Sequence, residues 1–164
     1  MHVVITGGAG FIGKKLARAL LERGALATES GRQAIEKLTL FDVVEAEGVA
    51  DDRRLATVAG DITDPAPWRS RLEGFDVVVH TAAVVTNNVE PVAAWNVNVV
   101  GTRRVLEAAA DIGVGRFVHV STMGVARFAQ IETDAVERFH PDAPLDERWP
   151  LMPTGNPYTD TKIA

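Results

Sequence analysis

Three glycines near the N-terminus form the first group of residues whose spacing could do chemistry. They lie in the segment Thr6-Gly7-Gly8-Ala9-Gly10-Phe11-Ile12-Gly13, which follows an apolar run and precedes an amphipathic one. Gly7 allows a tight turn after a strand, Gly10 lets a pyrophosphate group approach the backbone, and Gly13 permits close packing of a helix on a sheet. Because the free N–H groups at the start of a helix attract anions, the segment predicts the phosphate turn of a dinucleotide site.

The same segment begins like a loop that binds nucleoside triphosphates. The stretch from Gly8 to Lys14 has the required glycines and lysine, but the next residue, which should hold magnesium through a hydroxyl group, is Lys15. An ammonium group cannot act as a magnesium ligand. We therefore interpret the segment as a dinucleotide turn.

Two acidic residues follow predicted strands and could receive other parts of a dinucleotide. Asp42 ends the apolar run that starts at Leu38, and an acid there can accept hydrogen bonds from the adenosine ribose and repel a 2′-phosphate, which favours NAD over NADP. It lies farther from Gly13 than the usual ~20 positions because a polar stretch intervenes. Asp61 follows the next run and could accept a hydrogen bond from the adenine amine. The alternative for both acids is a local role, a turn at Asp42 and a helix cap at Asp61.

These residues need a sheet to bring them together, and the pattern of the chain predicts one. Short continuous runs of Val, Ile, Leu and Phe are typical of parallel strands that are covered on both faces. They alternate with two amphipathic stretches, 11–23 and about 91–112. The alternation predicts an α/β fold with a doubly wound parallel sheet, the Rossmann architecture. The expected strands are His2–Thr6, Lys37–Phe41, Leu55–Val58, Asp76–His80 and Arg116–Val120.

Apolar residues at helical spacing indicate which helix faces are buried. They include Ile12, Leu16, Ala19 and Leu20 in the first helix and Trp95, Val99, Leu106 and Ala110 in the second. Two stretches interrupt the alternation. Gly24–Glu36 is predicted to be a lengthened polar connection, and the proline-rich Phe128–Pro157 a long irregular loop, either a lid or a surface insertion.

The composition excludes several classes of protein. The chain has 164 residues and a net charge of −5, and its Arg53–Arg54 and Arg103–Arg104 pairs are isolated rather than part of a basic cluster. No apolar run approaches the ~18 residues of a membrane span. Without cysteine there is no disulfide framework and no Cys-based zinc site, and His80 and His119 do not form a metal-ligand spacing. We expect a cytoplasmic domain with neither a nucleic acid, a membrane nor a metal as partner.

Further motifs follow the glycine turn in order. They are Gly60-Asp61-Ile62, His80-Thr81-Ala82-Ala83, Asn98, Val120-Ser121-Thr122 and Tyr158-Thr159-Asp160-Thr161-Lys162. Together they resemble the extended short-chain dehydrogenases/reductases, also called the NAD-dependent epimerase/dehydratase family. The resemblance covers essentially the whole chain and implies NAD as the cofactor. By this resemblance, the residues that line the NAD cleft are Gly7, Gly10, Phe11, Ile12, Gly13, Asp42, Asp61, Ile62, Thr81, Ala82, Ala83, Asn98, Ser121, Tyr158 and Lys162.

The resemblance also implies a catalytic set. Tyr158 would be the acid/base, and Lys162 its activator and a contact of the nicotinamide ribose. Positions four apart are neighbours on one helix face, and an ammonium group beside a phenol favours the phenolate, which can exchange a proton with a substrate hydroxyl. Thr122 would orient the substrate oxygen. We choose it over Ser121 because the hydroxyl of the family lies three positions before a valine, here Val125. The Tyr-Gly that follows in the family is replaced by Ala126-Arg127, so the substrate side is atypical.

The activity implied is hydride transfer between NAD and a secondary alcohol of a sugar, sugar acid or polyol. The N-terminal third is most similar to D-erythronate dehydrogenases, through the long connection and the segment from Leu38 to Val44. One alternative is a nucleotide-sugar epimerase or dehydratase that recycles its NAD internally. Met123-Gly124 in place of the Asp-Glu pair of sugar dehydratases counts against dehydration. The other is a non-catalytic dinucleotide-binding module, against which the retained Tyr/Lys pair counts.

The last residues of the sequence begin a predicted helix. Asn156-Pro157 is typical of a helix start, yet the sequence ends at Ala164, whereas members of the family continue well past this point. We expect residues 1–164 to be one NAD-binding Rossmann domain, the N-terminal part of a longer enzyme, with little or no turnover alone. Substrate recognition and a homodimer would depend on the longer form.

Overall fold

A computed structural model of the chain describes residues 1–64, 68–85, 89–127, 151 and 153–164. They form two compact units. The first consists of Met1–Ala83 and Val100–Val120, and the second of Val84–Val99 and Ser121–Ala164. Most of the predicted irregular stretch Phe128–Pro157 lies outside the described residues.

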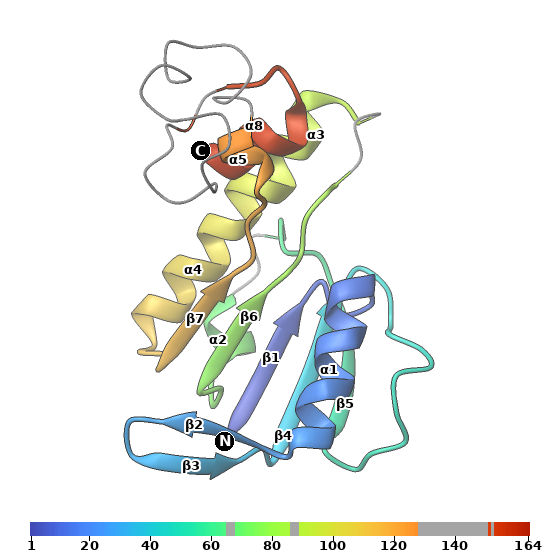
Figure 1. Cartoon of the computed structure of the whole chain (residues 1–164), viewed down its shortest axis with the longest axis vertical. Helices are drawn as coiled ribbons and strands as arrows, with labels where there is room; N and C mark the ends of the chain where they lie inside the picture. Colours follow the sequence, from blue (N-terminus) through green and yellow to red (C-terminus); the bar gives the residue numbers. More distant parts are fainter. Residues whose placement is uncertain (65–67, 86–88, 128–150, 152) are drawn as a thin grey trace. The chain divides into compact units, whose positions relative to one another are not determined.

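The first unit is built on a five-stranded parallel sheet (Figure 1). The order of the strands is β5-β4-β1-β6-β7, and all neighbours are parallel. Every predicted strand is present, with ends that differ by at most one residue, so the predicted Rossmann-like α/β fold is confirmed. The strands are β1 (His2–Thr6), β4 (Lys37–Asp42), β5 (Leu55–Ala59), β6 (Val77–His80) and β7 (Arg116–His119).

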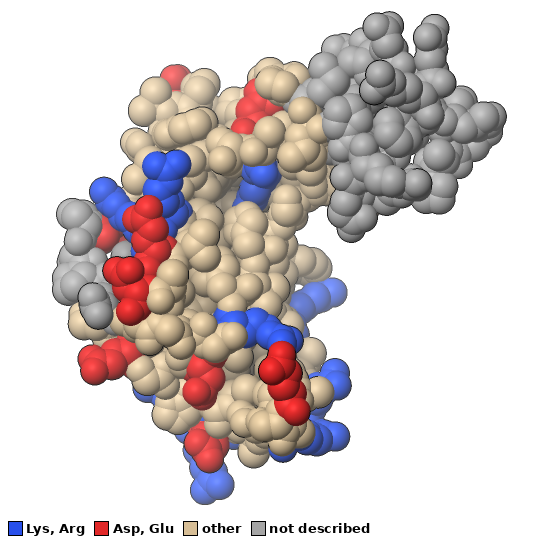
Figure 2. Space-filling view, turned by 90° about the vertical axis from the view of Figure 1, so that its left-hand side faces the viewer, with Lys and Arg blue, Asp and Glu red and all other residues tan. Residues whose placement is uncertain are grey.

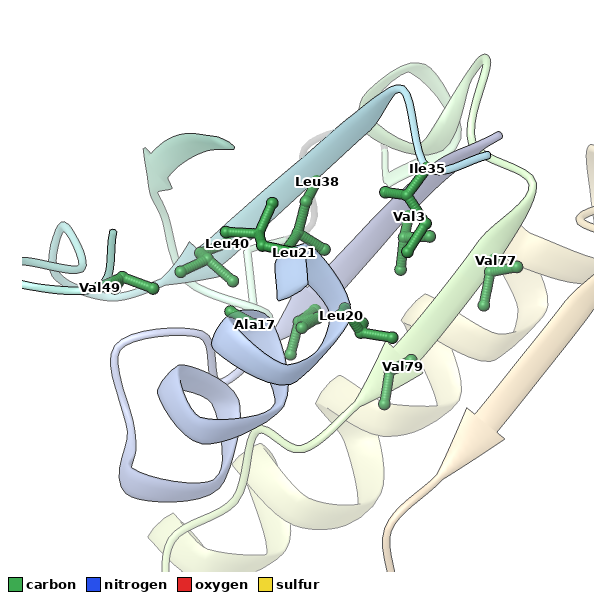
Figure 3. Close-up of a cluster of buried hydrophobic side chains, with 11 residues drawn as sticks. Val3, Ala17, Leu20, Leu21, Ile35, Leu38, Leu40, Val49, Val77 and Val79 are labelled. Atoms are coloured by element: carbon green, nitrogen blue, oxygen red, sulfur yellow. The ribbon is translucent and has the colours of Figure 1, made fainter. Parts of the chain in front are cut away.

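Helix α1 (Phe11–Arg23) covers one face of this sheet, and α2 (Trp68–Leu72) and α4 (Thr102–Asp111) lie on the other (Figure 1). Figure 3 shows the core under α1, where Ala17, Leu20 and Leu21 point at Val3 and Leu38 of the strands. The predicted face of α1 is partly wrong, because Ile12 is 52% exposed. The buried face instead includes the small residues Gly13 and Ala17, which let the helix approach the sheet closely.

The second predicted helix is divided in three. It consists of α3 (Pro91–Trp95), a π-helical segment (Asn96–Gly101) and α4. Trp95 and Leu106, predicted to be buried, are 48% and 46% exposed. Val99, also singled out from the sequence, is buried. The other buried positions are Ala94, Asn98, Gly101, Val105, Ala108 and Ala109. One of these residues is polar and another has no side chain, so the pattern of large apolar residues located only part of the buried face.

The connection Gly24–Glu36 contains an antiparallel hairpin that the sequence analysis missed. It is formed by β2 (Ala25–Thr28) and β3 (Gly31–Ala34). The N–H of Ile35 donates to the carbonyl of Gly24 at 2.8 Å, and the N-terminal ammonium of Met1 donates to the carbonyl of Ala34, also at 2.8 Å. The apolar run of β2 is only three residues long and β3 has none, so only the turn residues between them could have signalled a hairpin.

The second unit contains α3, α5 (Gly124–Arg127) and α8 (Pro157–Ile163). The predicted helix start at Asn156-Pro157 is confirmed. Oδ1 of Asn156 accepts hydrogen bonds from the N–H groups of Tyr158 at 3.0 Å and Thr159 at 3.2 Å, which satisfies two donors of the first turn.

Two further observations concern the helices and the surface charge. No helix within the described ranges is long and apolar enough to cross a membrane. On the face shown in Figure 2, acidic and basic side chains lie beside one another rather than in separate patches.

An ion pair holds the chain between β4 and β5. Nη2 of Arg54 lies 2.6 Å from Oδ2 of Asp52 and also donates to the carbonyl of Leu21 on α1 at 2.8 Å. Hydrogen bonds from the side chain and backbone of Arg54 lower the pKa of Asp52 from 3.8 to about 2. The pair therefore joins the start of β5 to the end of α1.

The pH dependence of stability tests this ion pair. A carboxyl group whose pKa is lower in the folded state stabilises the fold above its unfolded pKa, and this contribution is lost as the pH falls through the folded pKa. We expect Asp52→Asn to lower the free energy of unfolding in urea at pH 7, and the difference to shrink between pH 4 and pH 2. The exposed neighbour provides the control, Asp51→Asn. Equal stability of Asp52→Asn and the unchanged chain at pH 7 would contradict the prediction.

Candidate active site

The glycine turn between β1 and α1 is fixed by close contacts. Gly7 has a φ of +73°, and a Cβ atom there would lie 2.6 Å from the backbone nitrogen of Ala82 and 2.7 Å from the carbonyl carbon of Thr81. At Gly13 a Cβ atom would collide with the carbonyl oxygen of Gly7. Both positions therefore need glycine, as the sequence predicted, because the end of β6 and the start of α1 press against the turn.

The surroundings of Gly10 differ from those of Gly7 and Gly13. Within the described part of the chain, a Cβ atom at Gly10 would meet only the carbonyl oxygen of Gly7, at 3.2 Å. Gly10 is also the N-cap of α1, and no described side chain caps this end of the helix. The next side chains, Phe11 and Ile12, are exposed. An open approach to uncapped N–H groups at a helix start suits a pyrophosphate group.

Asp42 anchors the glycine turn. Its Oδ2 accepts a hydrogen bond from the N–H of Ala9 at 2.9 Å, and its Oδ1 accepts one from the N–H of Val43 at 2.7 Å. The structure thus brings this predicted ribose acceptor against the phosphate turn. The sequence did not indicate that the acid also holds the turn in place.

The ends of β1 and β6 are joined by side chains. Oγ1 of Thr81 donates to the carbonyl of Thr6 at 2.7 Å. The ring of His80, fully buried, lies 2.7 Å through Nδ1 from Oγ1 of Thr6 and 2.9 Å through Nε2 from Oγ1 of Thr102 on α4. The His80 ring stacks on that of His119 with the centroids 5.6 Å apart. Among the described residues, no group of three His, Asp or Glu side chains could hold a metal ion.

The predicted adenine-side residues form a turn directly after β5. Oδ1 of Asp61 accepts a hydrogen bond from the N–H of Thr63 at 2.7 Å, and the carbonyl of Asp61 accepts one from the N–H of Asp64 at 3.2 Å. Asp61 is exposed and Ile62 is buried. The preceding Gly60 donates to the carbonyl of Asp42 at 2.7 Å. The first unit therefore gathers the glycine turn, Asp42, Asp61–Ile62 and Thr81–Ala83 at the carboxyl ends of its strands.

The second unit carries the predicted catalytic residues. Tyr158 and Lys162 lie one turn apart on α8, and both are half-buried. Burial lowers the pKa of Lys162 from its ordinary value of 10.5. Ser121 and Thr122 come directly before α5, Ser121 exposed and Thr122 half-buried.

Thr122 lies beside α8 although the two are far apart in the sequence. Its Oγ1 accepts a hydrogen bond from the N–H of Gly124 at 3.2 Å. A Cβ atom at Gly124 would lie 3.3 Å from Oγ1 of Thr159 and 3.5 Å from Oγ1 of Thr122. Gly124 thus allows α5 to approach α8, next to Tyr158.

Asn98 connects the π-helical segment to α8. It is buried, its Oδ1 accepts from the N–H of Val84 at 2.8 Å, and its Nδ2 donates to the carbonyl of Val84 at 3.0 Å and to Oγ1 of Thr161 at 2.9 Å. Oγ1 of Thr161 in turn donates to the carbonyl of Tyr158 at 2.8 Å. The sequence analysis missed Thr161, because its spacing from Tyr158 did not show that it would face a buried amide.

Asp160 was also missed. Its Oδ1 accepts from the N–H of Thr154 at 2.6 Å and from Oγ1 of Thr154 at 2.9 Å, and its Oδ2 accepts from the N–H of Gly155 at 3.0 Å. This carboxylate closes the chain before α8 onto the helix. The start of the helix that carries Tyr158 is thereby fixed from two sides, by Asp160 and by Asn156.

The anchoring of the turn by Asp42 leads to a testable expectation. In Asp42→Asn the amide NH₂ would face the N–H of either Ala9 or Val43, and two donors cannot pair. We expect the affinity for NAD to fall about tenfold, the loss of one hydrogen bond to a charged group, and the preference for NAD over NADP to narrow, because the charge that repels a 2′-phosphate is lost. Parallel calorimetric titrations measure this, with Glu45→Gln at an exposed acid as control. Tighter binding of NADP than of NAD by Asp42→Asn would show that the acid only repels a 2′-phosphate.

The link between Asn98 and Thr161 is tested by a matched pair of variants. Thr161→Val leaves an amide N–H of Asn98 and the carbonyl of Tyr158 without their partner, which we expect to cost about 1–3 kcal/mol in the free energy of unfolding. Thr159→Val, at the other buried threonine of α8, should cost less, because its hydroxyl makes no hydrogen bond among the described residues. Equal losses in urea unfolding would refute the link.

The sequence of the chain is similar to those of known sugar-acid dehydrogenases and nucleotide-sugar dehydratases. The chain is 43% identical over 116 residues to D-erythronate dehydrogenase of Cupriavidus necator, which is 69% of this chain and 36% of that protein. It is 37% identical over 170 residues to dTDP-glucose 4,6-dehydratase of Streptomyces niveus, across 100% of this chain and 47% of that one. The predicted likeness to D-erythronate dehydrogenases is therefore confirmed. The chain spans less than half the length of these two relatives.

Solved structures show the same fold. A dTDP-glucose 4,6-dehydratase of Streptomyces venezuelae with NAD bound matches with a TM-score of 0.78 and 32% identity, covering 99% of this chain and 48% of that one. UDP-glucose 4-epimerase of Thermus thermophilus, also in complex with NAD, matches with a TM-score of 0.74 and 27% identity over 99% and 48% of the two chains. The sequence profile of the NAD dependent epimerase/dehydratase family matches residues 3–164. The chain therefore belongs to this family, the one that its motifs resemble.

Proposed function

We propose that this chain is the NAD-binding part of an oxidoreductase that moves hydride between NAD and a secondary alcohol of a sugar, sugar acid or polyol. The observation that carries the proposal is the glycine turn of the first unit, which leaves uncapped N–H groups accessible beside Gly10 and is anchored by Asp42. The family is NAD-dependent, which agrees with the predicted cofactor. A cytoplasmic location and a homodimer stay predictions.

The residues present fit NAD part by part. The start of α1 would receive the pyrophosphate, Asp42 the adenosine ribose, and Asp61 with Ile62 the adenine. Thr81, Ala82, Ala83, Asn98 and Ser121 would line the cleft, and Lys162 would contact the nicotinamide ribose. NAD, when bound, supplies the hydride acceptor or donor.

Tyr158, Lys162 and Thr122 would handle the proton of the substrate hydroxyl. In oxidation, the phenolate oxygen of Tyr158 accepts this proton, and in reduction the phenol returns it. Partial burial of Lys162 reduces the screening of its charge by water, which strengthens its effect on a phenolate nearby. Oγ1 of Thr122 accepts from Gly124, so its own O–H proton is available to a substrate oxygen.

A second candidate is a nucleotide-sugar epimerase or dehydratase with internal recycling of NAD. It is supported by the dTDP-glucose 4,6-dehydratase relative, which aligns with the whole of this chain. Against dehydration, the position after Thr122 holds Met123, whose side chain is exposed and cannot exchange a proton. A dehydrogenase releases NADH, whereas an epimerase or dehydratase leaves the net redox state of NAD unchanged.

Substitution of the tyrosine tests the proposed chemistry. In the protein that contains this chain, we expect Tyr158→Phe to lower turnover at least 100-fold, the usual contribution of a general acid/base, and to leave NAD affinity within about twofold. NADH absorbance with sugar acids, polyols and nucleotide sugars as substrates measures turnover and separates the two candidates. Thr159→Val, at the next position of α8, is the control. Retained turnover in Tyr158→Phe would overturn the assignment of Tyr158.

A further inference from the structure

The turn Asp61–Asp64 after β5 is held from two helices by arginine side chains. Arg104 of α4 donates a hydrogen bond from Nη1 to the carbonyl oxygen of Thr63. Nη2 of Arg71 on α2 lies 3.3 Å from Oδ2 of Asp64. The turn follows β5, which is an edge strand of the sheet. Both arginine contacts come from helices rather than from β5 itself.

The contact of Arg104 acts on one peptide unit. The carbonyl of Thr63 and the N–H of Asp64 belong to the same planar peptide, and this N–H donates to the carbonyl of Asp61. Arg104 therefore holds the peptide that closes the turn. Since the turn also places the N–H of Thr63 on Oδ1 of Asp61 at 2.7 Å, Arg104 fixes the orientation of the Asp61 carboxylate.

The side of the turn nearer β4 is closely packed. The guanidinium of Arg71 lies over the ring of Phe41 at 5.5 Å. A Cβ atom at Gly60 would lie 2.6 Å from Cζ of Phe41 and 3.1 Å from Nη1 of Arg71. This packing at Gly60 therefore fixes the start of the turn, whereas the Thr63–Asp64 peptide at its far end is held by Arg104.

The second carboxylate oxygen of Asp61, Oδ2, indicates what this arrangement could bind. Among the described residues, none donates a hydrogen bond to Oδ2 of the exposed Asp61. An ionised carboxylate is only an acceptor, so it attracts the exocyclic amine of adenine and repels the carbonyl oxygen that hypoxanthine carries at the same position. A carboxylate with a fixed orientation discriminates better than one that rotates, because no ordering is needed on binding.

We infer that Arg104 is a positioning residue that sets the preference of this site for adenine over hypoxanthine, by fixing Asp61 through the Thr63–Asp64 peptide. The inference rests on the proposed NAD site and on the role of Asp61 in it. The neighbouring Arg103 is exposed and makes no contact of this kind among the described residues, so it provides a matched control.

The test compares NAD with nicotinamide hypoxanthine dinucleotide, which has a carbonyl in place of the adenine amine. Dissociation constants for both are measured by fluorescence titration of the chain and of Arg104→Gln, Arg104→Lys, Arg103→Gln and Asp61→Ala. We expect the chain to prefer NAD about tenfold or more, and Arg103→Gln to keep this ratio. Arg104→Gln and Asp61→Ala should bring the ratio close to one, and Arg104→Lys, which still donates, should restore part of it.

The ratio separates positioning from a general loss of structure. A variant that is merely less stable binds both dinucleotides more weakly and keeps their ratio, so an unchanged ratio in Arg104→Gln overturns the inference. If the ratio falls in Asp61→Ala but not in Arg104→Gln, the proposed adenine site stands and the role of Arg104 is wrong. A ratio near one in the unchanged chain overturns both.

Discussion

The close approach of β1 and β6 at Gly7 is the constraint on which the rest of the first unit depends. Thr6 pairs with both Phe41 and His80, so three parallel strands end at the same level of the sheet. The chain after β6 then passes so near the glycine turn that no Cβ atom fits at Gly7. The hydrogen bond from Thr81 to Thr6 and the buried His80 hold this junction together. The turn, Asp42 and the segment Thr81–Ala83 are thereby brought to one edge.

Both units use side-chain oxygens in the same way to fix their functional segments. Asp42 and Asp61 in the first unit, and Asn98, Asn156 and Asp160 in the second, each accept hydrogen bonds from backbone N–H groups close to a proposed site residue. These bonds involve loops and helix starts, where the backbone has donors that the regular ladders do not satisfy. Local polar contacts, rather than the apolar core, thus determine how the site residues are oriented.

The sequence predicted the features that depend on local pattern and missed those that depend on tertiary contact. Continuous apolar runs located all five strands of the main sheet, and the glycine spacing located the turn before α1. The hairpin of Gly24–Glu36 has only a short apolar run in β2, and its strands are mostly exposed. The buried helix faces contain Gly13 and Asn98, which hydropathy ranks low although close packing and an amide network require them. Thr161 and Arg104 act through partners far away in the sequence, which spacing alone cannot reveal.

The hairpin β2–β3 and the glycine turn lie at opposite ends of β1. The hairpin is tied to Met1 before the strand begins, and the turn follows at Gly7. A five-residue strand at ~3.3 Å per residue separates the two ends by roughly 16 Å. The hairpin tip at Glu29 and Ser30 is exposed. This tip is therefore a suitable place to attach a fluorophore or to immobilise the protein, since a label there stays clear of the carboxyl edge of the sheet.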